Sequence, residues 1–268
     1  MFNRHFDPYN ILLDAETKTV VVLNPKVLTT FLRACYRDGC HAFRTGRDIS
    51  DGRYRWYPRA RSFPVPSIRQ FWQLNRGAPD HAIYGLVRNP YRRVLSGWRD
   101  KFLDPHVAGG GETKAYPRSM RRGELARFRR LAKNMGLPGG EEGELVPFHS
   151  FLAIIAAQTE GRRNHHWDKQ VVVMQCQHFD FTRIFRLEDE RDEALTAIFG
   201  RMGFAEDWIR QRAAKPKNQS AGGKGFYSNQ MAALVADVFR DDFARFGYDT
   251  ACPDDLISGN DTPIMSDP

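Results

Sequence analysis

The segment Thr19–Leu23 constrains the fold more than any other part of this 268-residue sequence. It is apolar almost throughout, which is typical of a strand buried on both faces of a sheet. The polar loop Asn24–Thr30 follows at once, and a helical pattern runs from Phe31 to about Arg37. A buried strand that leads through a loop into a helix is the repeating unit of α/β folds. We therefore expect an α/β fold with a mostly parallel sheet flanked by helices.

Two more strand, loop and helix units follow along the chain. Ala82–Val87 is the second expected strand, and it leads through a turn into a helix over Tyr91–Phe102. The third strand is expected over Phe179–Phe185, with a helix from about residue 189 to residue 202. Ligands of such sheets bind beyond the carboxyl ends of the strands, so we expect the chemistry there.

Three other elements complete the expected domain. A β-rich run, Tyr9–Leu13, precedes the first buried strand and is expected to pair with it as a hairpin. Apolar residues at helical spacing predict a helix over Phe148–Gln158 and a long last helix over Ser228–Phe246. The segment Asp104–Pro147, between the helix at Tyr91–Phe102 and the helix at Phe148–Gln158, is basic and rich in glycine, and we interpret it as an inserted lid. We expect one domain over residues 1–250 and a tail over residues 251–268.

Composition narrows the possible ligands and the cell compartment. A net charge of +8 favours anionic ligands but does not choose among nucleotide, acidic glycan, nucleic acid and lipid. The longest apolar stretch, Phe151–Ala157, is far too short to span a membrane, and the N-terminus has no apolar secretory segment. The four cysteines form no C-x-x-C pair. These features predict a cytoplasmic protein without a membrane anchor. No metal is implied, because the His and acidic residues show no ligand spacing.

The loop Pro25–Thr30 has the chemistry of an anion cradle. A helix N-terminus offers unpaired N–H groups and a positive dipole end, Lys26 adds a charge, and two Thr hydroxyls add donors. The loop lacks the glycines and the Lys-Ser/Thr pair of a Walker A motif. A Thr-capped helix with a solvated Lys is the alternative interpretation.

A second anion site is expected in the segment Val87–Ser96. Arg88 ends a strand, and Ser96 lies two turns along the following helix. A guanidinium fork and a hydroxyl at this spacing are suited to share one phosphate. Alone the signal is weak, since an arginine at a strand end often pairs with a local carboxylate.

Together, in this order, the two segments resemble the sulfotransferase superfamily. The stretch N-P-K-V-L-T-T is similar to the loop that grips the 5′-phosphosulfate of 3′-phosphoadenosine-5′-phosphosulfate (PAPS), and V-R-N-P-Y-R-R-V-L-S-G-W-R-D-K-F is similar to the 3′-phosphate segment. The extended match, with N-H-H-W at residues 164–167, F-D-F at residues 179–181, Glu188 and D-F-A-R-F-G-Y at residues 242–248, is most like the Golgi-type carbohydrate sulfotransferases.

The chain also departs from that family. Eukaryotic members carry an N-terminal membrane anchor and lumenal cysteines, one of them in the phosphosulfate loop where this chain has Thr29. The chain therefore resembles a soluble, bacterial relative. The insertion Asp104–Pro147 is its own in sequence, so the acceptor cannot be carried over from the family.

The resemblance implies a P-loop-like sulfotransferase fold and in-line attack by an acceptor hydroxyl on the sulfur of PAPS, with adenosine 3′,5′-bisphosphate leaving. It implies that Lys26 stabilises the leaving phosphate oxygen and that Arg88 with Ser96 holds the 3′-phosphate. The rest of the 5′ end would contact the loop residues Pro25, Val27, Leu28, Thr29 and Thr30. A polar loop before the last helix would close over the nucleotide through Lys217, Asn218 and Ser220, unless it is simply a solvated basic loop.

The catalytic base is left open between two residues. His166 matches the family's H-W and has a side chain that titrates near neutrality. Glu188 at the end of the third strand is the rival. A His in such a position is often structural, and only the position of each side chain relative to the acceptor hydroxyl would decide.

The acceptor is expected to be a carbohydrate, glycolipid or glycan, and its identity stays open, as does the oligomeric state. Interleaved cations and aromatic rings suit sugar stacking, single-stranded nucleic acid or no ligand at all. The candidate contacts are Arg53, Arg55, Trp56, His165 and Trp167. The basic run Arg118–Lys133 would suit an anionic glycan or a peripheral membrane contact, or is a solvated helix face.

Two other function classes remain open at this point. One is another P-loop-type nucleotide-binding enzyme, which would need a Walker Lys and Mg²⁺ ligands. The other is a non-catalytic basic protein that binds nucleic acid or an anionic polymer through its arginine runs. The sequence shows neither a Walker Lys nor Mg²⁺ ligands, which argues against the first class, and the combination of Lys26, Arg88 and Ser96 argues against the second. Nucleic acid is the least favoured partner.

Overall fold

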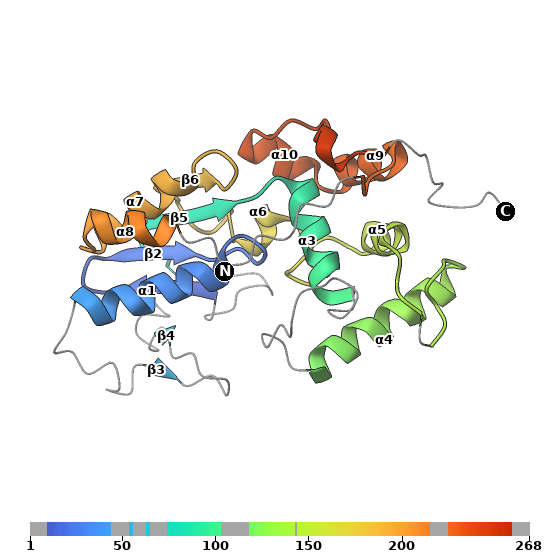
Figure 1. The fold of residues 1–268 in the computed structure, drawn as a ribbon, viewed down its shortest axis with the longest axis horizontal. Helices are drawn as coiled ribbons and strands as arrows, with labels where there is room; N and C mark the ends of the chain where they lie inside the picture. The colour runs from blue at the N-terminus through green and yellow to red at the C-terminus, as the bar shows by residue number, and fades with distance from the viewer. Residues whose placement is uncertain are drawn as a thin grey trace. The chain divides into compact units, whose positions relative to one another are not determined.

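The computed structural model describes residues 10–43, 54–55, 63–64, 74, 76–102, 118–142, 144–214 and 225–258 (Figure 1). The chain forms two compact parts, each built from two stretches of sequence. The first part combines residues up to Asn89 with Asp168–Gln219, and the second combines Pro90–Trp167 with the residues from Ser220 onward. Whether they make up the single expected domain over residues 1–250 stays a prediction.

The first part contains a four-stranded sheet in the order β1-β2-β5-β6. Its strands are β1 (Ile11–Asp14), β2 (Thr19–Val22), β5 (Ala82–Val87) and β6 (Arg183–Arg186). β1 pairs with β2 in an antiparallel hairpin, whereas β2, β5 and β6 run parallel. The mostly parallel sheet expected from the sequence is thus confirmed. A separate pair of short strands, β3 (Tyr54–Arg55) and β4 (Phe63–Pro64), is antiparallel.

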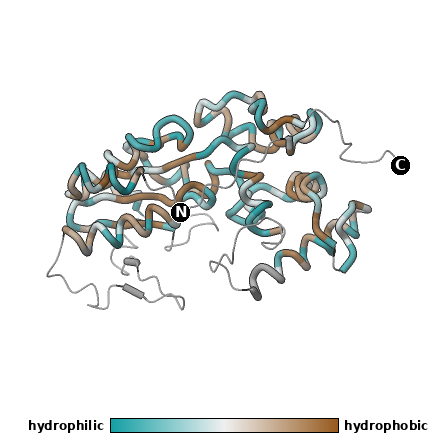
Figure 2. The backbone as a smooth tube through the Cα atoms, in the orientation of Figure 1, coloured by the Kyte–Doolittle hydropathy of each residue, from teal (hydrophilic) through white to brown (hydrophobic). Residues whose placement is uncertain are grey.

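Helices cover the sheet of the first part because its strands are apolar on both faces (Figures 1 and 2). α1 (Thr29–Phe43), α7 (Arg191–Arg201) and α8 (Glu206–Ala213) share one apolar cluster with alternate residues of the strands. On the other face, the residues just after α6 (Gln170–Val173) approach β5 so closely that a Cβ on Gly85 would lie 2.3 Å from Met174 Cε.

The second part is a helical bundle with an aromatic core. Its helices are α3 (Pro90–Phe102), α4 (Arg118–Asn134), α5 (Phe148–Ala157), α9 (Asn229–Val238) and α10 (Arg240–Phe246). α5 is the most apolar of them and is brown over most of its length in Figure 2. The rings of Phe102, Phe128, Phe151 and Trp167 lie within contact of one another.

Two expected elements differ from the structure. The single helix expected over Ser228–Phe246 is broken at Phe239, whose φ of −108° and ψ of 20° end α9 and precede α10. The apolar stripe continues through the break, because Val235, Phe239 and Phe243 are all buried. An apolar stripe shows which side of a segment faces the core, but it does not show whether the helical backbone hydrogen bonds continue without a break. The third strand begins at Arg183 and not at Phe179.

Parts of the expected insertion and of the tail pack into the second part. Phe128 and Ala132 of α4 are fully buried, so this section of Asp104–Pro147 belongs to the core, while residues 103–117 lie outside the described residues. In the tail, the Leu256 carbonyl accepts hydrogen bonds from the backbone N–H groups of Phe226 and Tyr227 at 2.8 and 2.9 Å. Leu256 itself is buried and ends the short 3₁₀ helix η2 (Asp254–Leu256).

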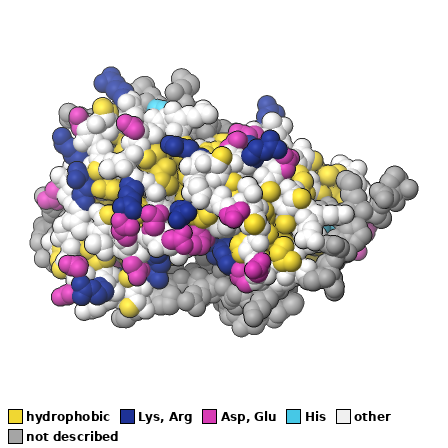
Figure 3. All heavy atoms as spheres, turned by 90° about the horizontal axis from the view of Figure 1, so that it is seen from above, with side chains coloured by type: hydrophobic (Ala, Val, Ile, Leu, Met, Phe, Trp, Pro, Cys, Tyr) yellow, Lys and Arg dark blue, Asp and Glu magenta, His cyan; other side chains and the backbone are white. Residues whose placement is uncertain are grey.

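Within the described ranges, no helix is long and apolar enough to cross a membrane. Figure 3 shows one face of the molecule, on which Lys and Arg side chains alternate with Asp and Glu side chains over the described surface. The excess of +8 is therefore not gathered into one basic patch on this face.

Candidate functional site

Three of the expected site residues follow neighbouring parallel strands of the first part. Lys26 follows β2, Arg88 follows β5 directly, and Glu188 follows β6 by two residues. The carboxyl ends of parallel neighbours lie at one edge of a sheet, so the topology brings these side chains together. This proximity cannot be predicted from the sequence motifs alone, because Lys26 and Glu188 are 162 positions apart.

The loop Asn24–Leu28 is closed on itself by a shared carbonyl. Asn24 O accepts a hydrogen bond from Val27 N at 3.1 Å and another from Thr29 Oγ1 at 2.8 Å. Lys26 and Leu28 both adopt positive φ angles, 72° and 52°, which side chains other than glycine rarely do. Such left-handed residues cost about 1–3 kcal/mol each, and left-handed backbone of this kind is one component of anion-binding nests.

This geometry changes what the two threonines can do. Thr29 is half-buried, and its hydroxyl donates to Asn24 O within the loop. The sequence predicted instead that this hydroxyl contacts the 5′ end of PAPS. Thr30 is exposed in the first turn of α1. The N–H groups of this turn have no intrahelical carbonyl, so the helix itself offers donors to an anion.

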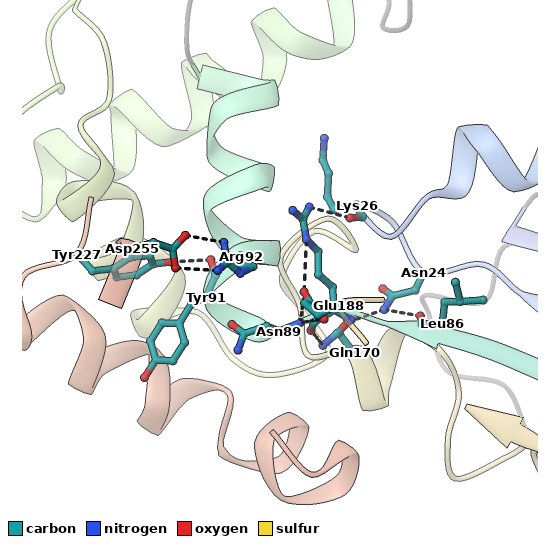
Figure 4. A network of polar contacts seen from close by, with 11 residues as sticks. Asn24, Lys26, Leu86, Asn89, Tyr91, Arg92, Gln170, Glu188, Tyr227 and Asp255 are labelled. Atoms are coloured by element: carbon teal, nitrogen blue, oxygen red, sulfur yellow. Dashed lines mark hydrogen bonds and ion pairs between the residues drawn. The ribbon is translucent and has the colours of Figure 1, made fainter. Parts of the chain in front are cut away.

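Gln170 connects the ends of β2 and β5 and is fully buried. Its Oε1 accepts from Asn24 Nδ2 at 2.7 Å and from Arg88 N at 3.0 Å, and its Nε2 donates to Arg88 O at 2.8 Å. Asn24, also buried, donates to Leu86 O at 3.3 Å. One amide thus holds the backbone of Arg88 on both sides and fixes the loop after β2 (Figure 4).

Arg88 and Glu188 form the polar centre of this edge. Arg88 Nη1 donates to Lys26 O at 3.3 Å, and Arg88 Nε lies 3.9 Å from Glu188 Oε1. Both carboxylate oxygens of Glu188 accept from Asn89 N, at 3.1 and 3.2 Å. The Lys26 side chain extends away from Glu188 in Figure 4. The edge therefore presents two cations on a constrained backbone, a donor set suited to a phosphate or sulfate group.

Among the described residues, four expected site residues lie in the second part of the chain. Ser96 is half-buried on α3, so its sharing of one phosphate with Arg88 stays a prediction. His165 is half-buried, and His166 is 8% exposed with Nδ1 2.7 Å from Asn164 Oδ1. Trp167 is fully buried among aromatic rings. That packing leaves no ring face for stacking on a sugar, and we retain no substrate contact for it.

The start of α3 also carries structural residues of the motif around Arg88. Tyr91 Oη donates to Thr250 O at 2.6 Å, and Tyr227 Oη donates to Tyr91 O at 2.8 Å. Burial raises the pKa of Tyr91 to about 12, and burial likewise raises the pKa of Cys252 to about 12. Arg92 forms two hydrogen bonds with Asp255 at 2.8 and 3.0 Å. These contacts hold residues 250–258 against α3.

The remaining expected contacts fall on residues that the structure does not describe in full. Arg53, Trp56, Lys217, Asn218 and Ser220 lie outside the described residues, and of Arg55 only the backbone in β3 is described. Gln170 and Asn89 were missed by the sequence analysis. Gln170 lies in a helix of four residues, which is too short to show a periodic pattern. Asn24 was also given no role of its own, but it had one usable signal, its position between a buried strand and a proline.

Comparison with protein families matches residues 53–249 to the sulfotransferase family. The match includes Arg88, Ser96, His166 and Glu188, and it begins after the loop that carries Lys26. No match was found among the curated proteins or the solved structures.

Proposed function

Because this chain belongs to the sulfotransferase family, we propose that it transfers the sulfuryl group of PAPS to a hydroxyl of a carbohydrate, glycolipid or glycan. The observation that carries the donor assignment is the sheet edge of the first part. There, a loop with two left-handed residues, a helix N-terminus, Lys26 and Arg88 form one cationic cradle. The phosphates and the sulfate of PAPS are the anionic groups that such a donor set fits.

We assign the roles as follows. Lys26 balances the charge that develops on the leaving phosphate oxygen, while the N–H groups at the start of α1 hold the 5′ end. Arg88, with Ser96, binds the 3′-phosphate. Lys217, Asn218 and Ser220 are assigned to closing over the nucleotide, and Arg53, Arg55, Trp56 and His165 to the acceptor. The donor supplies the sulfuryl group, and the protein supplies position and charge.

His166 is our preferred base. Both oxygens of Glu188 accept from Asn89 N, and its carboxylate lies beside Arg88. These contacts favour a role in positioning the Arg88 guanidinium over a role in taking the proton from the acceptor hydroxyl. In the proposed reaction, a bond forms between the acceptor oxygen and sulfur while the bond from sulfur to the phosphate oxygen breaks. The acceptor proton passes to the imidazole.

The donor site is tested by calorimetry with adenosine 3′,5′-bisphosphate, using the wild type, Lys26→Ala and Arg88→Ala. Loss of a hydrogen bond to a charged group costs about 1.5–3 kcal/mol, so Arg88→Ala should weaken binding by about 10- to 150-fold. Arg210→Ala is the matched control, because it removes a cation from an exposed helix face. It should bind like the wild type.

5′-AMP is the control ligand for the 3′-phosphate. Wild-type binding that is equal for 5′-AMP and for the bisphosphate would contradict the proposal, as would no binding of either. The acceptor class is tested with ³⁵S-labelled PAPS and a panel of unsulfated chondroitin, hyaluronan and galactosylceramide. Label in none of these acceptors would argue against a carbohydrate hydroxyl.

A further inference from the structure

We propose that Glu124 and Asn164 position His166 by fixing which of its ring nitrogens carries the proton, so that Nε2 is the basic nitrogen. Glu124 belongs to α4, and Asn164 to the loop that carries His166. All three residues lie in the second part of the chain. The inference deepens the proposed function, because it rests on His166 as the base, and it adds two residues to which the sequence had assigned no role.

The orientation of the Asn164 amide follows from two independent contacts. Asn164 Oδ1 lies 3.0 Å from the backbone N of His166, which can only donate. Asn164 Nδ2 lies 3.1 Å from Glu124 Oε1, and an ionised carboxylate can only accept. Exchanging the amide oxygen and nitrogen would turn both contacts into repulsions. The oxygen therefore faces His166 and the NH₂ group faces Glu124.

The same amide oxygen determines the state of the His166 ring. Asn164 Oδ1 lies 2.7 Å from His166 Nδ1, a hydrogen-bond distance, and an amide oxygen has no proton to give. Nδ1 must then be the N–H donor. In the neutral ring this leaves the lone pair on Nε2, which is the form a general base needs. When Nε2 takes a proton, the Nδ1–H bond to Asn164 persists, so the ring keeps its orientation through the transfer.

Other contacts hold the loop at the same place. Arg93, which is 1% exposed, donates from Nη2 to the carbonyl of His165 at 2.9 Å. A Cβ on Gly97 would lie 3.3 Å from the carbonyl of His166, so α3 approaches this backbone closely. Trp167, the residue after His166, is anchored in the aromatic core. These contacts fix the backbone that carries His166, and the hydrogen bond from Nδ1 to Asn164 Oδ1 holds the ring on it.

The test is ¹⁵N NMR of the histidine rings in the wild-type protein at a pH where His166 is neutral, with His166→Gln to assign its signals. We expect a protonated Nδ1 and an unprotonated Nε2. Asn164→Ala should abolish this preference and Glu124→Ala should weaken it. Glu124→Gln should preserve it, because a glutamine oxygen can still accept from Asn164. A protonated Nε2 in the wild type would overturn the inference, as would an unchanged pattern in Asn164→Ala.

Calorimetry with adenosine 3′,5′-bisphosphate on the same samples separates this inference from the proposed function. All variants should bind it like the wild type, which also shows that they are folded. If the wild type shows the expected ring pattern but does not bind the bisphosphate, the proposed function fails and the positioning role stands. On an acceptor from the panel, Glu124→Ala should lower kcat by about 10- to 100-fold with little change in the donor KM, as for other supporting residues, and Glu124→Gln should restore it.

Discussion

The two parts of the chain hold their candidate residues by different means. In the first part, strands deliver Lys26, Arg88 and Glu188 to one edge, and a buried amide, Gln170, ties the backbone of that edge together. In the second part, His166 lies in a loop. Asn164 faces its ring, and Glu124, 40 positions earlier in the sequence, orients the Asn164 amide. The sheet edge therefore depends on one buried amide that bonds to two strand ends, whereas the loop of His166 is held by several separate contacts.

The sharpest way to test this contrast is one substitution made in both parts. Gln170→Leu leaves the backbone N–H and C=O of Arg88 and one N–H of the Asn24 amide without their partner, and each buried unsatisfied group costs about 1–3 kcal/mol. We expect a loss of about 3–5 kcal/mol in the free energy of unfolding, measured in urea.

Gln158→Leu is the matched control in the second part. In the described structure its Oε1 and Nε2 are buried without a hydrogen-bond partner, so the leucine should change stability by less than about 1 kcal/mol or increase it. Equal losses in the two variants would refute the role given to Gln170.

A smaller loss in the free energy of unfolding is expected at alkaline pH, and it should come from buried groups of the second part. Tyr91 and Cys252 of the second part both have pKa values raised to about 12 by burial, from 10.0 and 9.0. The unfolded chain then releases these protons first, so stability is full below pH 9 and falls between pH 9 and pH 12. Two pKa units at the buried Tyr91 correspond to about 2–3 kcal/mol.

The measurement is the free energy of unfolding across that pH range. Cys252→Ser should remove the part of the slope that begins near pH 9. Tyr91→Phe should reduce the part that begins near pH 10, to which Tyr227 also contributes because burial raises its pKa as well. A slope that neither substitution alters would mean that other groups cause the alkaline loss.

The smallest expected effect concerns the two threonines of the cradle. Thr29→Val removes the hydrogen bond to Asn24 O and should cost about 1 kcal/mol of stability. Thr30→Val, on the exposed neighbour, should stay within about 0.5 kcal/mol. Urea unfolding of the two variants measures the difference, and similar values for both would show that the Thr29 hydroxyl does not close the loop.

The sequence predicted those features whose signal is local. The hairpin of β1 and β2, the strand β5 and the helix α3 each carry their pattern within a dozen residues. Lys26 and Arg88 could be singled out because both stand next to a buried strand. Gln170 and Glu124 could not, because each acts through a contact distant in sequence and neither has a pattern of its own. A single carboxylate within the basic run of α4 gives no sign that it faces an amide.

The burial of Trp167 shows a further limit. Its motif predicted an acceptor contact, since a tryptophan beside histidines suits a sugar as well as it suits a core. Only the surrounding rings of Phe128 and Phe151 decide between the two, and they come from helices elsewhere in the chain.

Residues 250–258 lie beyond the family match but are bonded to the rest of the second part of the chain. The family match ends at residue 249, yet the backbone of the next nine residues is bonded to Tyr91, Phe226 and Tyr227. A chain trimmed where the family similarity stops would lose these bonds and uncover the buried ring of Tyr91. For preparing the protein, a C-terminal boundary should therefore not fall before residue 258, a requirement set by the packing of this chain rather than by what it shares with its relatives.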